Sequence, residues 1–281
     1  STMRRVRAAI HADALRACVL LGVLPVAAVG RAARTGPEPR AGRIVGENLM
    51  PLVERDAECT LVILVYRSLR WLDWCMEGVE SSKQDTRYRW CVVANDATDE
   101  VTNDPRITVD WRNSDPAEHY ISRVYRAWGE GVLNSPTPLC LLMNSDMLCT
   151  DYAIDELVEQ KTTKRHSLPC GLLVENGRIN SGMPDHVQDF GTNPDNFRRD
   201  DFLKHAAHIR QRRMTEAGRL FQPVVFERQE FMDMGGYPCG NIGGVSGDRI
   251  LFDKYVKAGF EWVTCLGSVW AHCQEGEQRW P

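Results

Sequence analysis

The chain has 281 residues, 43% of them hydrophobic and 26% charged, with a formal net charge of −4. This length suits one α/β domain of the larger sort with an extension, and this composition excludes wholesale disorder. The ten cysteines are scattered, with no Cys-x-x-Cys pair and no zinc-like cluster, which predicts free thiols in a reducing compartment, the cytoplasm.

Positive charge is concentrated at the N-terminus. Residues 1–43 hold eight arginines against Asp13 and Glu38, a net charge of +6, so the remainder carries −10. A basic arm on an acidic body predicts an anionic partner for the arm. Residues 35–42 contain two prolines and two glycines, which predicts a linker. We therefore assign residues 1–46 to a basic helical extension with its linker and residues 47–281 to the body.

Three interpretations of the arm stay open. Residues 19–29 are apolar and would suit a secretory signal or anchor, although they are shorter than the roughly 20 residues of a membrane span. Residues 13–21 and 26–34 would also form two short helices, resembling a helix-turn-helix with arginines on its second helix. The third interpretation is a helical extension that packs on the body or on a neighbouring subunit. We expect no membrane span.

The body opens with a strand–helix–strand pattern. An apolar strand is predicted at 59–66, a helix at 69–82 and a second strand at 88–94, which runs into the polar turn 95–99. This is the βαβ unit of a nucleotide-binding half-domain. A strand at 106–110 and a helix at 117–133 follow. Arg123 and Arg126 share one face of that helix and would either reach phosphates or face solvent.

The next strand, 138–143, is an apolar run that ends abruptly in Asn144-Ser145-Asp146. Buried parallel strands have this character, and α/β sheets bind ligands at the carboxyl ends of their strands. A carboxylate there, beside a small polar residue, suits a divalent cation that keeps positions open for phosphate oxygens. The alternative is that these residues simply form a turn.

A helix at 151–160 and a strand at 168–174 come next. Residues 176–196 are rich in Gly, Asn, Pro and Asp and predict a long active-site loop. The helix predicted at 197–216 is rich in Arg and His and presents either a solvated face or a surface for an anionic acceptor. The remaining elements are a strand at 222–226, a short helix at 227–234, a helix at 247–258 and a strand at 261–266.

Several motifs in this order resemble the GT-A glycosyltransferases of the family 2 type. Asn144-Ser145-Asp146 resembles their Asp-x-Asp motif, with Asn144 in the place of the first acid. The strand ending at Tyr66 and the acidic turn 95–99 resemble their opening. Gly235-Gly236-Tyr237, then Gly247-Asp248 and a late His272, resemble their Gly-Gly-Tyr, Gly-Glu-Asp and His, with Gly247 in the place of the Glu. The resemblance covers roughly residues 58–273.

The resemblance implies an α/β fold of the GT-A class, with a Rossmann-like nucleotide-sugar half and an acceptor half in one continuous mixed sheet. It implies transfer of a sugar from a nucleotide diphosphate sugar, most simply a UDP-sugar, to an acceptor hydroxyl with inversion. Asp248 would be the catalytic base, and Asp146 and His272 would hold Mn²⁺ or Mg²⁺. The implied donor-binding residues are Tyr66, Asp96, Asp99, Asn144 and Ser145. Asp96 and Asp99 are alternatives for one position, because the turn is one residue shorter than the family pattern.

Other readings stay open at this point. Asp248 or Ser246 would cap a helix, Asp96 or Asp99 would form an Asx-turn, and His272 would be structural. The acceptor would be a polysaccharide, a small molecule, a protein or, given the basic arm, a hydroxymethylated base in phage-type DNA. A non-catalytic nucleic-acid-binding protein on the same fold is the alternative from another class. It is favoured by Asn144 and Gly247, which replace acids.

Overall fold

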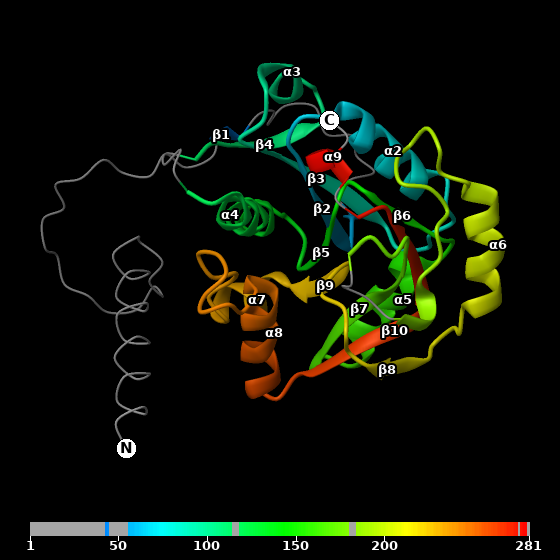
Figure 1. Ribbon diagram of the computed structural model, residues 1–281. Coiled ribbons are helices and arrows are strands. Elements are labelled where there is room, and N and C mark those ends of the chain that lie inside the picture. The colour runs from blue at the N-terminus through cyan, green and yellow to red at the C-terminus, as the bar shows by residue number, and fades with distance from the viewer. Residues whose placement is uncertain (1–42, 45–55, 114–117, 180–183, 275, 280–281) are drawn as a thin grey trace, which may run out of the picture.

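The computed structural model describes residues 43–44, 56–113, 118–179, 184–274 and 276–279 (Figure 1). The short helices, the linker and the apolar segment expected within residues 1–42 lie outside the described residues. Among the helices that the structure describes, none combines the length and the apolar character needed to cross a membrane.

One mixed sheet of ten strands forms the centre of the molecule, in the order β1-β4-β3-β2-β5-β9-β7-β10-β6, with β8 paired to β10. The strands β2 to β5 run parallel to one another, β9 runs antiparallel to β5 and β7, and β10 is parallel to β7. The strands are β1 (Arg43–Ile44), β2 (Cys59–Val65), β3 (Tyr88–Asn95), β4 (Ile107–Trp111), β5 (Leu139–Met143), β6 (Met147–Cys149), β7 (Ser167–Glu175), β8 (Thr215–Ala217), β9 (Val224–Glu227) and β10 (Glu261–His272).

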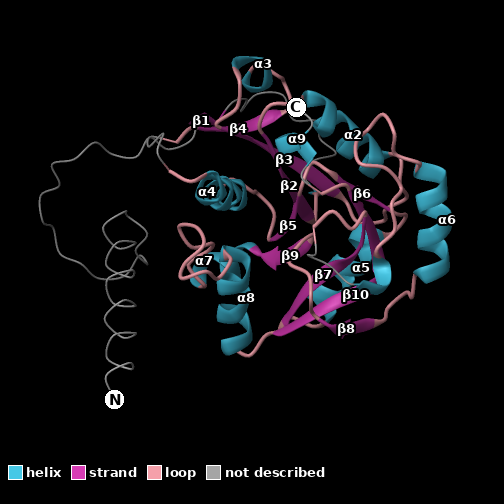
Figure 2. Cartoon of the chain, in the orientation of Figure 1, coloured by secondary structure: helices cyan, strands magenta, loops and turns pink. Residues whose placement is uncertain are grey.

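Helices flank this sheet (Figure 2). Helix α4 lies close against β2, because Gly131 has no side chain where an added Cβ would overlap Val62. The helices are α2 (Leu69–Glu80), α3 (Asp99–Thr102), α4 (Tyr120–Leu133), α5 (Ala153–Thr163), α6 (Arg199–Ile209), α7 (Arg228–Asp233), α8 (Gly247–Lys257) and α9 (Gly276–Arg279), with a 3₁₀ turn at Pro184–His186.

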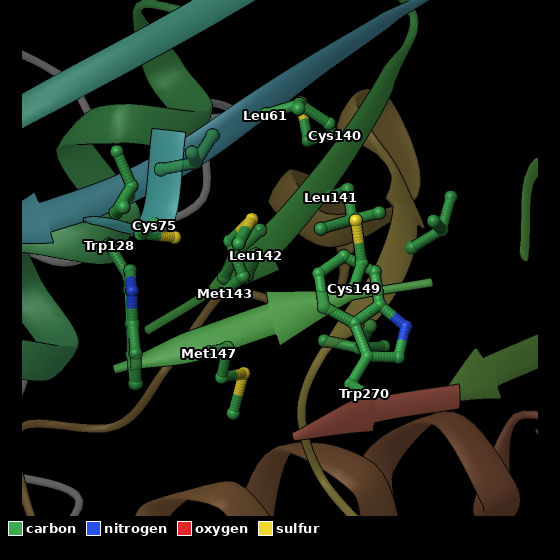
Figure 3. Packing of buried hydrophobic residues seen from close by; sticks show 14 of the residues in the cluster. Leu61, Cys75, Trp128, Cys140, Leu141, Leu142, Met143, Met147, Cys149 and Trp270 are labelled. Carbon is green, nitrogen blue, oxygen red and sulfur yellow. The ribbon is translucent and has the colours of Figure 1, made fainter. Parts of the chain in front are cut away.

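The core lies on both faces of the central strands. All five residues of β5 are buried, as expected for a strand with helices over both faces of its sheet. Figure 3 shows Leu141, Leu142 and Met143 of β5 packed among other buried residues, with Met147 and Trp270 nearby. This packing fixes the carboxyl ends of β2, β3 and β5, from which the loops of the candidate site leave.

The regular elements expected in the body are present, with two corrections. The helix predicted at 197–216 is wrong in its last part, because α6 ends at Ile209 and Thr215–Ala217 form β8 on the edge of β10. The final strand is longer than predicted and runs to His272, because an irregularity between Cys265 and Val269 shifts its pairing with β7 and allows the strand to continue. Strand β1 pairs with β4, so residues 43–44, assigned to the extension, add to the sheet.

Candidate active site

A cavity of about 450 Å³ opens beside the carboxyl ends of β2, β3 and β5. Its position follows from the fold, since the loops that leave these parallel strands converge on one edge of the sheet. Six of the eight predicted site residues line the cavity: Tyr66, Asp96, Asn144, Ser145, Asp146 and His272. The other two, Asp99 and Asp248, do not line it.

Strand pairing brings Asp146 and His272 together. β6 begins directly after Asp146 and pairs with the end of β10, with Met147 opposite His272. Oδ1 of Asp146 lies 3.5 Å from Nε2 of His272. On its other side, His272 pairs with Glu175 at the end of β7, and Nδ1 of the imidazole lies 2.8 Å from Oε1 of Glu175. The imidazole therefore lies between two carboxylates.

The charges of this group stabilise one another. Burial by itself would lower the pKa of His272, but the carboxylates of Asp146 and Glu175 outweigh that effect and raise the pKa to about 10. Burial by itself would raise the pKa of Asp146, but His272 and the backbone amide of Gly276 outweigh it and hold the pKa below its usual range. Without a metal ion, the group is therefore an imidazolium held by two carboxylates at neutral pH.

The side chains of Asp146 and His272 also suit a divalent cation. Glu175 engages Nδ1 of His272, which leaves Nε2 directed at Asp146, and a carboxylate behind a histidine is the usual support for a metal-binding imidazole. Among the described residues, no three His, Cys, Asp or Glu side chains are grouped to hold a metal ion. Asp146 and His272 therefore suit an ion whose other positions are filled by ligand oxygens and water.

The other end of the cavity contains Tyr66 and Asp96. Tyr66 is half-buried, and the guanidinium of Arg67 lies 4.5 Å from the centre of its ring. Asp96 has a left-handed backbone, with φ of 48°, and its carboxylate accepts from the amide of Asn113 at 2.6 Å and pairs with Arg123 at 3.3 Å. Asp96 thus holds Arg123, which also lines the cavity.

Asp99 and Arg126 lie outside this cavity. Asp99 is exposed in the first turn of α3, so Asp96 is the acid of the turn that faces the cavity. Arg126 pairs with Glu118 at 3.0 Å. Of the two arginines that share a face of α4, only Arg123 is placed to meet a ligand in the cavity.

Asp248 lies in the first turn of α8, against an aromatic cluster. The hydroxyl of Tyr125 donates to Oδ2 of Asp248 at 2.9 Å, and the ring of Tyr237 stacks on Tyr125 with 4.9 Å between centres. Trp128, which contacts both rings, lines the cavity. Burial raises the pKa of the Asp248 carboxyl, and the hydrogen bond from Tyr125 opposes that rise. The helix cap is Ser246, whose hydroxyl accepts from the amide of Arg249.

The position before Asp248 has room only for glycine. A Cβ on Gly247 would lie 2.7 Å from Cζ and 2.8 Å from Cδ2 of Tyr125, and real Cβ atoms essentially never come this close to another heavy atom. A glutamate at 247, as in the resembled motif, would displace the residue that donates to Asp248. Tyr125 therefore explains why the chain departs from the motif here.

Sequence reasoning missed part of the site. Glu175 directly follows the predicted apolar strand 168–174 and is the last residue of β7, and a polar residue at a strand end was the available signal. Gly276 and Glu277 lie beyond the last motif and carried no signal. The amide of Gly276 donates to Oδ2 of Asp146 at 2.9 Å. The carboxylate of Glu277 accepts from the amides of Tyr66 at 2.7 Å and Arg67 at 3.4 Å.

No known protein family matches the sequence, and no curated protein matches it either. Among solved structures, the chain is similar to GalNAc-T7 in a crystal structure with UDP, GalNAc and Mn²⁺, with a TM-score of 0.51 and 14% identity. The similarity covers 77% of this chain and 44% of the GalNAc-T7 chain, so this chain spans less than half the length of that protein. At this identity the likeness concerns the fold. The GT-A fold expected from the sequence, built on a mixed sheet, is confirmed.

Proposed function

We propose that this protein is a metal-dependent glycosyltransferase that moves a sugar from a UDP-sugar to an acceptor hydroxyl. The observation that carries the proposal is the cavity at the strand ends, where Asp146, His272 and Arg123 face the same space. A negatively charged diphosphate is complementary to a metal ion and a guanidinium. GalNAc-T7, with the same fold, has been crystallised with UDP and Mn²⁺.

Each lining residue has a role in this proposal. Asp146 and His272 hold Mn²⁺ or Mg²⁺, which when bound neutralises the charge on the leaving diphosphate. Because a metal-bound imidazole must be neutral, His272 releases a proton as the ion binds. Tyr66 contacts the nucleobase, and Asp96 holds Arg123 toward the phosphates or accepts from the base or ribose. Asn144 and Ser145 supply uncharged hydrogen-bonding groups for the donor.

Asp248 is our candidate for the base of an inverting transfer. A buried carboxylate with a raised pKa is better matched to taking a proton near neutral pH than an exposed one. Since Asp248 does not line the cavity, the acceptor must approach past Trp128 and the loop that joins α7 to α8. That loop has left-handed glycines at Gly240, Gly243 and Gly244, whose backbone tolerates conformations that other residues avoid.

Nucleotide binding tests the proposal directly. We expect UDP to raise the melting temperature of the protein only when Mn²⁺ or Mg²⁺ is present, and EDTA to remove the shift. Asp146→Ala should abolish the shift, whereas the matched control Asp200→Ala, at an exposed position on α6, should keep it. Equal shifts with and without metal, or an unaffected Asp146→Ala variant, would refute the metal site.

Turnover tests the base separately. Asp248→Asn nearly preserves shape and removes the proton acceptor, so UDP binding should persist while transfer slows by about 10²-fold or more. A product with retained anomeric configuration, determined by NMR, would rule out the inverting mechanism. A screen of UDP-sugars for hydrolysis identifies the donor.

We also propose an acceptor and a compartment for this protein. The +6 charge of residues 1–43 favours an anionic acceptor, such as a hydroxymethylated base in DNA. DNA affinity that falls steeply between about 50 and 200 mM salt, and that is lost when the arm is removed, would support it. The nine described cysteines are all free, which fits a reducing compartment such as the cytoplasm.

A further inference from the structure

Gly276 and Glu277, near the C-terminal end of the chain, line the cavity and contact residues at both ends of the cavity. We call this pair the C-terminal latch. Helix α9, drawn in red in Figure 1, begins with the latch. At one end the amide of Gly276 donates to Oδ2 of Asp146. At the other end the carboxylate of Glu277 accepts from the amides of Tyr66 and Arg67, directly after β2.

The latch is packed tightly against Asp146. A Cβ on Gly276 would lie 3.0 Å from both Cγ and Oδ2 of Asp146, so the backbone here rests directly on the carboxylate. Gly276 is buried and lines the cavity together with Glu277. The latch therefore forms part of the wall of the cavity and engages one oxygen of the carboxylate assigned to the metal ion.

Only one of the two carboxylate oxygens of Glu277 accepts hydrogen bonds. Oε2 has two amide donors, but Oε1 is buried with no hydrogen-bond partner. Burial raises the pKa of Glu277 to about 7, with the backbone amides of Tyr66 and Arg67 opposing the rise. In its ionised form this carboxylate is an anion in a cavity suited to anions, and it repels a second anion placed beside it. The latch and a diphosphate with its metal ion therefore compete for this part of the cavity.

We propose that Gly276 and Glu277 form an autoinhibitory latch, which closes the donor cavity and must leave it before the nucleotide diphosphate and its metal ion bind. The inference rests on the proposed function, since it regulates that site. When the binding-competent state is only a fraction of the population, the apparent dissociation constant is the intrinsic one divided by that fraction. Weakening the latch should therefore tighten nucleotide binding.

Calorimetric titration with UDP and Mn²⁺ tests this competition. We expect Glu277→Ala to bind UDP about tenfold more tightly than the unmodified protein, because losing two charge-assisted hydrogen bonds opens the latch. Glu277→Gln keeps the shape of the side chain and an oxygen that accepts from the backbone amides, but it loses the charge. Its affinity for UDP should lie between those of Glu277→Ala and the unmodified protein. The control Asp200→Ala should match the unmodified protein. Weaker or unchanged binding by Glu277→Ala would overturn the latch.

Hydrogen exchange separates failure of the latch from failure of the proposed function. In the absence of nucleotide, the amides of Tyr66 and Arg67 should exchange faster in Glu277→Ala than in the unmodified protein. Unchanged exchange would overturn the latch while leaving the nucleotide site intact. If neither the unmodified protein nor any variant binds UDP with Mn²⁺, the proposed function fails. The competition between latch and nucleotide then fails with it, even where hydrogen exchange shows that the latch contacts Tyr66 and Arg67.

Discussion

Replacing Gly247 by alanine tests the contact that ties the candidate base to the aromatic cluster. An added Cβ would lie 2.7 Å from Cζ of Tyr125, and Tyr125 is buried with its ring stacked on Tyr237. The ring cannot rotate away freely, so the added methyl must be accommodated by movement of the ring or of the first turn of α8. Either movement lengthens the hydrogen bond from Tyr125 to Asp248.

Two opposing effects set the change in the free energy of unfolding caused by Gly247→Ala. Overpacking a buried contact costs about 1 to 3 kcal/mol, whereas replacing glycine by alanine in a helix gains at most about 1 kcal/mol. The gain is small here, because Gly247 is the first residue of α8 and little helix precedes it. We therefore expect Gly247→Ala to lower the free energy of unfolding by about 1 to 2 kcal/mol, measured by urea denaturation.

A double-mutant cycle identifies the cause. Tyr125→Ala removes the ring and is destabilising on its own, but Gly247→Ala should then have little or no further effect, because the added methyl no longer meets a ring. Gly129→Ala serves as the control, since nothing lies within 4 Å of a Cβ added there. A neutral or stabilising Gly247→Ala in the otherwise unmodified protein would refute the steric reasoning.

Three further predictions follow from the contacts around the cavity. Tyr125→Phe removes the hydrogen bond that lowers the pKa of Asp248, so the acid limb of the pH profile of kcat/KM should move to higher pH; an unmoved limb would count against Asp248 as the base. The folded-state pKa of Glu277 is about 7 against an ordinary 4.5, so the folded state binds the extra proton between these values and stability falls as pH rises from about 4.5 through 7. This contribution, at most about 3 kcal/mol, is missing from Glu277→Gln. In urea denaturation the loss of stability between pH 5 and pH 8, to which His272 also contributes in both proteins, should therefore be smaller in that variant, and an equal loss in both proteins would contradict the prediction. Arg123→Ala should weaken binding of UDP by about tenfold, because it removes a charge-assisted contact, whereas Arg126→Ala should not; equal losses in the two titrations would contradict the assignment of the cavity.

The parts of the fold that could be predicted are those whose signal is local. The apolar runs that became β2, β3 and β5 end within one residue of the positions expected, because a strand buried on both faces must exclude polar side chains until it leaves the core. Asp146 could be predicted for the same reason, as a carboxylate where such a run stops. The Ser246 cap has an equally local signature and was one of the two caps considered.

The remaining parts depend on pairings between distant segments. The group formed by Asp146, His272 and Glu175 requires β10 to lie between β6 and β7, and residues 175 and 272 are joined only through that pairing. The extension of β10 beyond the predicted strand depends on an irregularity at Cys265 to Val269, which the apolar pattern does not encode. The latch was missed because its polar atoms meet partners about 130 and 210 residues away.

The two positions at which the chain departs from the GT-A motifs have different physical explanations. At Gly247 the reason is steric, since Tyr125 fills the space that a side chain would take. At Asn144 we propose an electrostatic reason, which rests on the proposed metal site. The carboxylates of Asp146 and Glu175 both contact His272, so with a neutral imidazole they already provide two negative charges to balance a divalent cation. A third carboxylate at 144 would add like-charge repulsion in a partly buried cavity, and a neutral amide that still offers an oxygen avoids it. Under the proposed function, the chain can lose one acid of the motif, because Glu175, outside the motif, would supply the second negative charge through its contact with His272.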